Sequence, residues 1–181
     1  MNVLITGASG LVGHHFLRYM SGMGGHNLFA ISRRNATRLK GVNYIFGDIA
    51  YGETYGNLPE YIDFCLHAAA EINMGKSLPE REATIKTNVL GTLRLCEALA
   101  TKKCKHIVFC STISVYAPSP RGELTEESNT IPVTQYGISK FYAENIVRSL
   151  GVNFTILRLC SLLDLEGISR KHQPLLYEWR D

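Results

Sequence analysis

The sequence predicts an α/β protein with a doubly wound, Rossmann-type parallel sheet and helices on both faces. Two observations support this fold class: strand-like and helix-like runs alternate along the chain, and a glycine-rich turn links the first run of each kind. Short apolar runs, several rich in β-branched residues, are predicted to be buried strands. They are Val3–Thr6, Leu28–Ser32, Asn43–Phe46, Ile62–His67, His106–Ser111 and Phe154–Leu159.

Helical spacing of apolar residues predicts three helices between these strands. They cover Leu11–Ser21, Glu80–Ala100 and Thr134–Leu150, and short helices are expected after the second and third strands. The alternation stops after Ser161, and few residues remain. We therefore assign residues 1–165 to one domain and expect residues 166–181 to be the remnant of a C-terminal region.

Three glycines lie where the first strand turns into the first helix. Gly7, Gly10 and Gly13 permit a tight turn, a close approach of ligand phosphates to the backbone, and close helix–strand packing. The free N–H groups and the dipole of the helix start then suit a pyrophosphate. The turn predicts a dinucleotide-binding domain, although a glycine-rich turn that binds nothing would have the same pattern.

Composition narrows the classes of partner. The 181 residues carry a net charge of +3, which is too small to indicate a nucleic-acid partner, and no apolar run is long enough for a membrane span. Five cysteines show no C-x-x-C pairing, which favours buried free thiols and a reducing, cytoplasmic location over a zinc site. Histidines and carboxylates lack metal-ligand spacing, so we expect no metal.

The residues after the second strand bear on the choice of cofactor. An NAD-binding unit is expected to place Asp or Glu there, but the first acidic residue of the chain is Asp48. Arg33 and Arg34 occupy the position instead, and a guanidinium can clamp a 2′-phosphate. We therefore expect NADP, with NAD as the alternative. A solvated basic loop would explain the same arginines.

A candidate catalytic set follows the fifth strand. Tyr136 and Lys140 are four residues apart and so share one helical face, where an ammonium would favour the phenolate. A hydroxyl to hold a substrate oxygen could come from Ser111, Thr112 or Ser114 at the strand end.

Taken in order, these motifs resemble the extended short-chain dehydrogenase/reductase family, the NAD(P)-dependent sugar epimerases and dehydratases. The matching segments are T-G-A-S-G-L-V-G from Thr6, D-I at Asp48, H-A-A-A from His67, N-V-L-G-T from Asn88, S-T-I-S-V-Y from Ser111, and Y-G-I-S-K from Tyr136. The resemblance implies cofactor contacts from Gly7, Ser9, Gly10, Leu11, Val12, Gly13, Arg33, Asp48, Ile49, His67, Ala68, Ala69, Tyr136 and Lys140.

The same resemblance implies catalytic roles. Tyr136 would be the general acid/base, Lys140 would lower the pKa of Tyr136 and hold the nicotinamide ribose, and Thr112 would position the substrate oxygen, with Ser111 as the fallback. Related dehydratases carry an Asp-Glu pair after the threonine, where this chain has Ile113 and Ser114. Dehydration is therefore disfavoured.

A reaction by hydride transfer alone remains, on a hydroxyl or ketone of a sugar or nucleotide sugar. The alternatives are a thioester or carbonyl reductase of the same family, and a non-catalytic dinucleotide-binding regulator. Family members commonly pair their two long helices in a homodimer, which we expect here. They also continue into a C-terminal substrate domain, so we expect these 181 residues to bind dinucleotide but to be weak or inactive alone.

Overall fold

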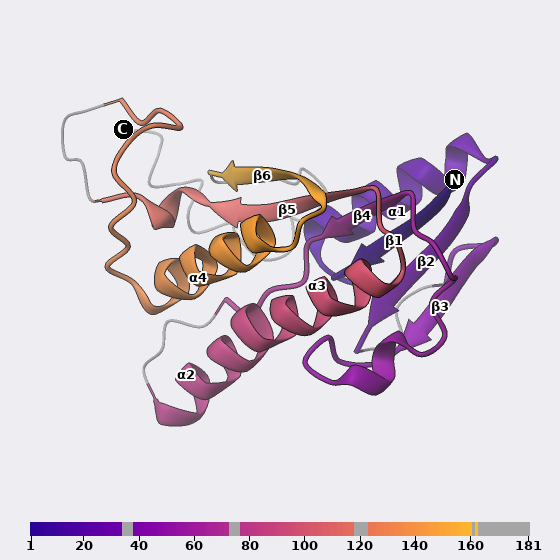
Figure 1. The fold of residues 1–181 in the computed structure, drawn as a ribbon, viewed down its shortest axis with the longest axis horizontal. Coiled ribbons are helices and arrows are strands. Elements are labelled where there is room, and N and C mark those ends of the chain that lie inside the picture. The colour runs from indigo at the N-terminus through magenta and orange to yellow at the C-terminus, as the bar shows by residue number, and fades with distance from the viewer. Residues whose placement is uncertain (34–37, 73–76, 118–122, 161, 163–181) are drawn as a thin grey trace, which may run out of the picture.

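The fold is built on one parallel sheet. In the computed structural model, which describes residues 1–33, 38–72, 77–117, 123–160 and 162, six strands pair in the order β3-β2-β1-β4-β5-β6 (Figure 1). The strands are β1 (Asn2–Thr6), β2 (Asn27–Ser32), β3 (Val42–Phe46), β4 (Phe64–His67), β5 (His106–Thr112) and β6 (Asn153–Leu159). Every neighbouring pair is parallel, which confirms the predicted fold class, and each strand begins and ends within two residues of its predicted bounds.

Helices cover both faces of this sheet (Figure 1). Helix α1 (Leu11–Met23) packs Leu17 against Val3 and Ile5 on one face. On the other face, α3 (Gly91–Thr101) and α4 (Gln135–Ser149) lie side by side over a core that includes Leu4. Alternate side chains of β1 thus belong to two separate cores, one on each face of the sheet, as expected for a strand buried on both sides.

The predicted long helix over Glu80–Ala100 is a continuous but uneven run of helix. It begins with α2 (Leu78–Ile85), where Ser77 and Glu80 form a capping box, and it widens to a π-helical turn, η2 (Lys86–Leu90), before α3. Gly91 then lies against Ile49, since an added Cβ would come within 2.7 Å of the Ile49 side chain. The π turn therefore lies where the helix passes the end of β3, beside the site described below.

Two short 3₁₀ helices, η1 (Gly52–Tyr55) and η3 (Ile113–Val115), follow β3 and β5. The first is the short helix expected after the third strand, whereas residues 34–37, after the second strand, lie outside the described residues. Residues 166–181, the expected C-terminal remnant, also lie outside them.

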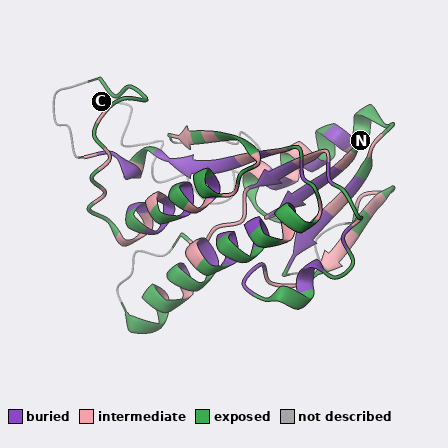
Figure 2. Cartoon of the chain, in the orientation of Figure 1, coloured by how far each residue is buried: buried purple, intermediate pink, exposed green. Residues whose placement is uncertain are grey.

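Burial decreases from the centre of the sheet to both edges, and the edge strand β3 has no buried residue. Figure 2 shows the central strands buried between the helices, whereas β6, an edge strand, is mostly intermediate or exposed. Cys65, Cys96, Cys104 and Cys110 are buried free thiols, as expected, and Cys160 is exposed. No helix in the described part of the chain is long and apolar enough to cross a membrane, and nowhere within it do three His, Cys, Asp or Glu residues gather as a metal-binding group would.

Candidate active site

The glycine turn has the geometry that its sequence predicts. Gly7 adopts a φ of 71°, and a Cβ there would lie 2.6 Å from the amide nitrogen of Ala69. A Cβ on Gly13 would lie 2.3 Å from the carbonyl oxygen of Gly7. Gly10 is the N-cap of α1 and supplies no capping side chain, so the first N–H groups of the helix remain available to an anion.

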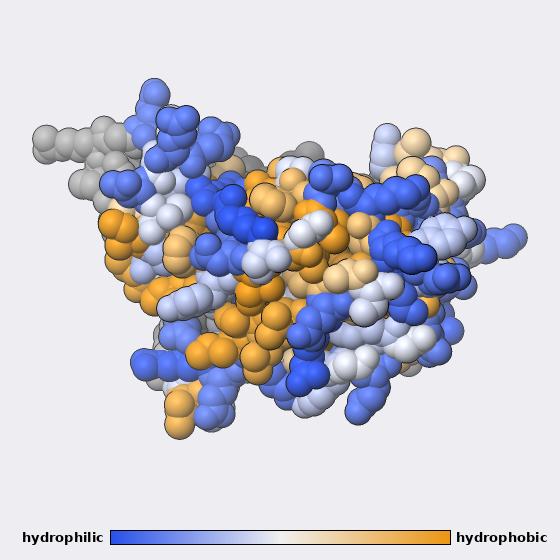
Figure 3. Space-filling model, viewed as in Figure 1, coloured by the Kyte–Doolittle hydropathy of each residue, from blue (hydrophilic) through white to orange (hydrophobic). Residues whose placement is uncertain are grey.

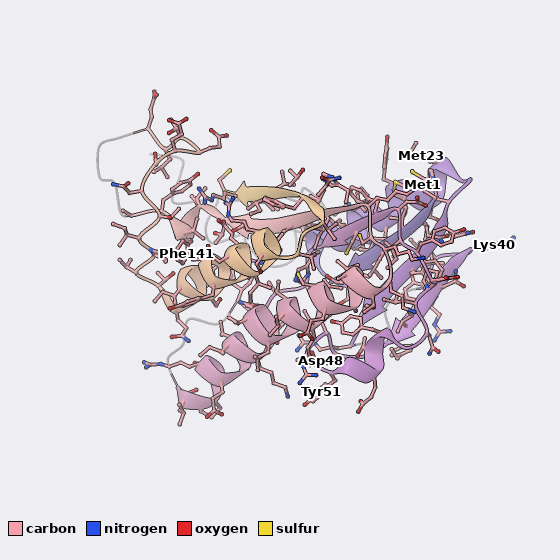
Figure 4. All side chains as sticks on the ribbon, in the orientation of Figure 1. Met1, Met23, Lys40, Asp48, Tyr51 and Phe141 are labelled. Carbon is pink, nitrogen blue, oxygen red and sulfur yellow. The ribbon has the colours of Figure 1, made fainter. Side chains whose placement is uncertain are left out.

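A cavity of about 240 Å³ opens above this turn. Its walls are the glycine turn, the ends of β2 and β3, and the Ala68–Ala70 segment after β4. It therefore brings together many of the residues expected to hold a dinucleotide: Gly7, Ser9, Gly10, Arg33, Asp48, Ile49, Ala68 and Ala69. The carboxylate of Asp48 also accepts the Ala50 N–H at 2.9 Å, and Figure 4 shows Asp48 and Tyr51 together after β3.

The expected phosphate-reading arginine is already paired. Arg33 Nη2 lies 3.3 Å from Glu71 Oε2, and the ion pair reaches from the end of β2 to the segment after β4. Arg34 lies outside the described residues. The role of Glu71 could not be read from the sequence, because the pair joins positions 38 residues apart.

A second cavity, of about 400 Å³, adjoins the first along Gly10, Ala68 and Ala70. It is lined by the start of α1, the end of β5, and α4, and it brings Thr112 and Tyr136 together with Leu11 and Val12. The candidate substrate-facing hydroxyls thus lie beside the candidate cofactor cavity. Gly13 supports this arrangement from behind through its contact with Gly7.

Helix α4 positions Tyr136 and Lys140. Its N-cap, Thr134, accepts the Gly137 N–H at 3.0 Å, and Lys140 is 1% exposed with Nζ 4.0 Å from the centre of the Phe109 ring. Burial lowers the pKa of Lys140 to about 7, against smaller opposing effects of Cys110 and Glu144.

Burial, together with Cys110, raises the pKa of Tyr136. Lys140 is not among the causes of this shift, so the expected lowering of the Tyr136 pKa by Lys140 is not seen in this structure.

The two candidate hydroxyls at the end of β5 have different partners. Thr112 Oγ1 accepts the Ser114 N–H at 3.2 Å and donates to the Ser114 hydroxyl at 3.3 Å. Ser111 instead donates to Glu144 Oε1 at 2.6 Å. The Ser111 hydroxyl is thus committed to a buried carboxylate, which leaves Thr112 as the better candidate.

Glu144 supports the candidate site through its contacts with Ser111 and Arg158. The sequence motifs did not predict it as a site residue. Arg158 donates to both of its oxygens, from Nε at 3.0 Å and Nη2 at 2.8 Å. Burial alone would raise the pKa of Glu144, but the hydrogen bonds from Arg158 and Ser111 outweigh it and hold the pKa below its ordinary value. The spacing of Tyr136, Lys140 and Glu144, four residues apart each time, was the available signal.

His67 requires a correction, because it does not reach either cavity. The side chain is fully buried, its two ring nitrogens bond the hydroxyls of Thr6 at 2.7 Å and Thr92 at 2.9 Å, and its ring packs on Phe109. Burial, with help from Lys140, lowers the pKa of His67 to about 3 and keeps the ring neutral. His67 therefore packs behind the wall of the candidate cofactor cavity and lines neither cavity.

Comparison with known proteins agrees with this geometry. A family model described as the NAD dependent epimerase/dehydratase family matches residues 3–167. The chain is similar to the low-salt glycan biosynthesis protein Agl12 of Haloferax volcanii, with 31% identity over 82% of this chain and 51% of that protein. It is also similar to a UDP-glucose 4-epimerase of Halalkalibacterium halodurans, with 26% identity over 87% of this chain and 50% of the relative.

A solved structure extends the comparison to the fold. MoeE5 in complex with UDP-glucose and NAD is 27% identical, with a TM-score of 0.73, over 86% of this chain and 52% of that chain. The chain spans about half the length of the curated relatives that it matches. Sheet order, glycine turn and the ordered motifs all fit the matched family model, and the chain belongs to the NAD dependent epimerase/dehydratase family.

Proposed function

We propose that this chain supplies the cofactor-binding and hydride-transfer part of an oxidoreductase or epimerase acting on a hydroxyl or ketone of a nucleotide sugar. The observation that carries the proposal is the second cavity, which holds Tyr136 and Thr112 against the start of α1 and continues into the cavity over the glycine turn. A proton donor, a hydroxyl and a pyrophosphate cradle thus share one groove. The epimerases among the relatives support the substrate class.

The residues present fit a nicotinamide dinucleotide, because glycines and small side chains line the cavity over the turn and α1 begins there with no side-chain cap on its first N–H groups. When bound, the cofactor supplies the hydride acceptor or donor. Tyr136, whose pKa is raised, is protonated near neutral pH and is suited to give its proton to a ketone oxygen. Lys140, once charged, would favour the reverse transfer, and Thr112 would hold the substrate oxygen.

Dehydration is not the reaction we propose. That route needs an acid and a base beside the threonine, and the chain offers Ile113, which is exposed, and Ser114, whose hydroxyl is bonded to Thr112. Neither side chain can serve as a strong acid or base. Hydride transfer alone, as in epimerisation through a keto intermediate, needs neither.

We further propose that Arg33 allows NADP to bind in addition to the NAD on which the family depends, since it lines the cofactor cavity where a 2′-phosphate would lie.

We also propose a homodimer through the α3–α4 side. Large apolar side chains there are exposed, among them Leu93, Ile138 and Tyr142, and Figure 3 shows hydrophobic residues gathered on this side of the molecule.

Two measurements test the proposed function. Calorimetric titration of the 181-residue chain with NAD⁺ and NADP⁺ should show binding, and failure of both to bind would overturn the proposal. Hydride transfer to and from UDP-sugars should be assayed by nicotinamide absorbance, with Tyr136→Phe as the variant. That variant should lose any turnover that the wild-type chain shows and keep cofactor affinity, whereas equal loss of both would indicate a structural role for Tyr136.

A further inference from the structure

An ion pair lies at the edge of the candidate cofactor cavity. Arg33, which lines the cavity at the end of β2, reaches Glu71, which follows the Ala68–Ala70 wall after β4. We propose that Glu71 is a specificity-determining residue: by holding Arg33 it sets the balance between NAD and NADP. This inference rests on the proposed function.

Glu71 is held more firmly than Arg33. Its N–H donates to Asn88 Oδ1 at 2.7 Å and its carbonyl oxygen accepts Asn88 Nδ2 at 3.0 Å. Asn88 is itself 1% exposed and donates to the Ser139 hydroxyl at 2.9 Å, which anchors the segment to α4. Both contacts of Glu71 involve its backbone, so its carboxylate is presented from a fixed support that a change of side chain leaves intact.

Arg33 is the partner that can move. Its side chain is 51% exposed, against 25% for Glu71, and a long flexible chain in water loses little when it changes partner. A guanidinium binds a phosphate at least as well as a carboxylate, because its donors match both in a bidentate way. A 2′-phosphate at this position must therefore compete with Glu71 for the same group.

The competition has opposite consequences for the two cofactors. NAD has a 2′-hydroxyl, so Arg33 can stay on Glu71 and its charge remains neutralised. NADP must draw Arg33 away, and its phosphate must also tolerate the nearby carboxylate. An arginine of this kind therefore does not by itself exclude NAD, which is consistent with the NAD dependence of the family.

The test uses charge-matched variants. Glu71→Gln removes the charge and keeps the backbone contacts, whereas Glu60→Gln removes an exposed charge in the loop before β4, at the opposite end of the strands from the cavity. Calorimetric titration with NAD⁺ and NADP⁺ at low and high salt gives both dissociation constants for each protein. We expect Glu71→Gln to tighten NADP⁺ binding about three- to tenfold, with NAD⁺ changed less than about twofold, and Glu60→Gln to change neither.

A second pair of proteins, both carrying Arg33→Ala, separates the inference from the proposed function. In an Arg33→Ala protein the additional change Glu71→Gln should alter NADP⁺ affinity by much less than in the parent. If the wild-type chain binds a dinucleotide but Glu71→Gln leaves the NADP⁺:NAD⁺ ratio unchanged, or acts equally without Arg33, the inference is wrong and the proposed function stands. If neither dinucleotide binds the wild-type chain, both are wrong.

Discussion

Replacing Lys140 by methionine should stabilise the protein at neutral pH while removing a residue that the proposed function needs. Lys140 is 1% exposed, and burial lowers its pKa from the ordinary 10.5 to about 7. Its Nζ lies over the Phe109 ring, and that contact compensates only part of the lost hydration. Methionine fills a similar volume without a charge, so the cost of burying the ammonium disappears.

The direction of the pH dependence of stability follows from proton linkage. Between pH 7 and 10.5 the unfolded chain holds the Lys140 proton more tightly than the folded chain, so the contribution of Lys140 to the free energy of unfolding rises with pH in this window. Below pH 7 both states are protonated and the contribution is constant. From pH 7 to 9.5 the wild type should gain roughly 1.5–3 kcal/mol relative to Lys140→Met.

Urea denaturation of both proteins at pH 7.0, 8.0 and 9.5 measures this difference. The comparison with the variant matters because the raised pKa values of Tyr136 and the buried cysteines act in the opposite direction at high pH and are shared by both proteins. Parallel pH profiles would refute the reasoning, since they would mean that Lys140 has an ordinary pKa in the folded state.

Three further changes test other parts of the structure. Gly13→Val should abolish dinucleotide binding in titration, because its Cβ would lie 2.3 Å from the Gly7 carbonyl oxygen; circular dichroism must show a folded chain, and retained affinity would contradict the cradle. Glu144→Ala should cost about 3–5 kcal/mol of unfolding free energy in urea, because Arg158 would lose its buried partner; a loss below about 1 kcal/mol would contradict this. Ile138→Glu should shift the mass measured by light scattering from dimer to monomer, and an unchanged dimer would exclude this helix face.

The fold could be predicted from the sequence because its signals are local. Each strand is a short apolar run, and the glycines at 7 and 13 are required by backbone approaches of under 3 Å. The widened turn at Lys86–Leu90 was not predictable in this way, because a π turn has no periodic signature over so few residues. The helical spacing of apolar residues predicted the continuous helical run but not its π-helical turn.

Only part of the candidate site could be predicted from the sequence, and the reason is physical. A motif identifies a residue but does not fix the direction of its side chain, and His67 shows the consequence. On β4 the alternation places His67 on the same face as Cys65, toward α3, where Thr92 is one of its partners. The ion pair of Arg33 with Glu71 was not predicted for another reason. It depends on how two loops are positioned by strands that are distant in sequence.

The charges along α4 suggest how binding and chemistry are connected. Glu144 is ionised and paired with Arg158, Lys140 titrates near neutral pH, and Tyr136 stays protonated. The helix alone therefore lacks the full positive charge that would ionise the tyrosine. Lys140 lines neither cavity in this structure; were a bound ligand to bring hydroxyls to its Nζ, they would favour the ammonium form by replacing lost hydration, and that charge would lower the pKa of Tyr136.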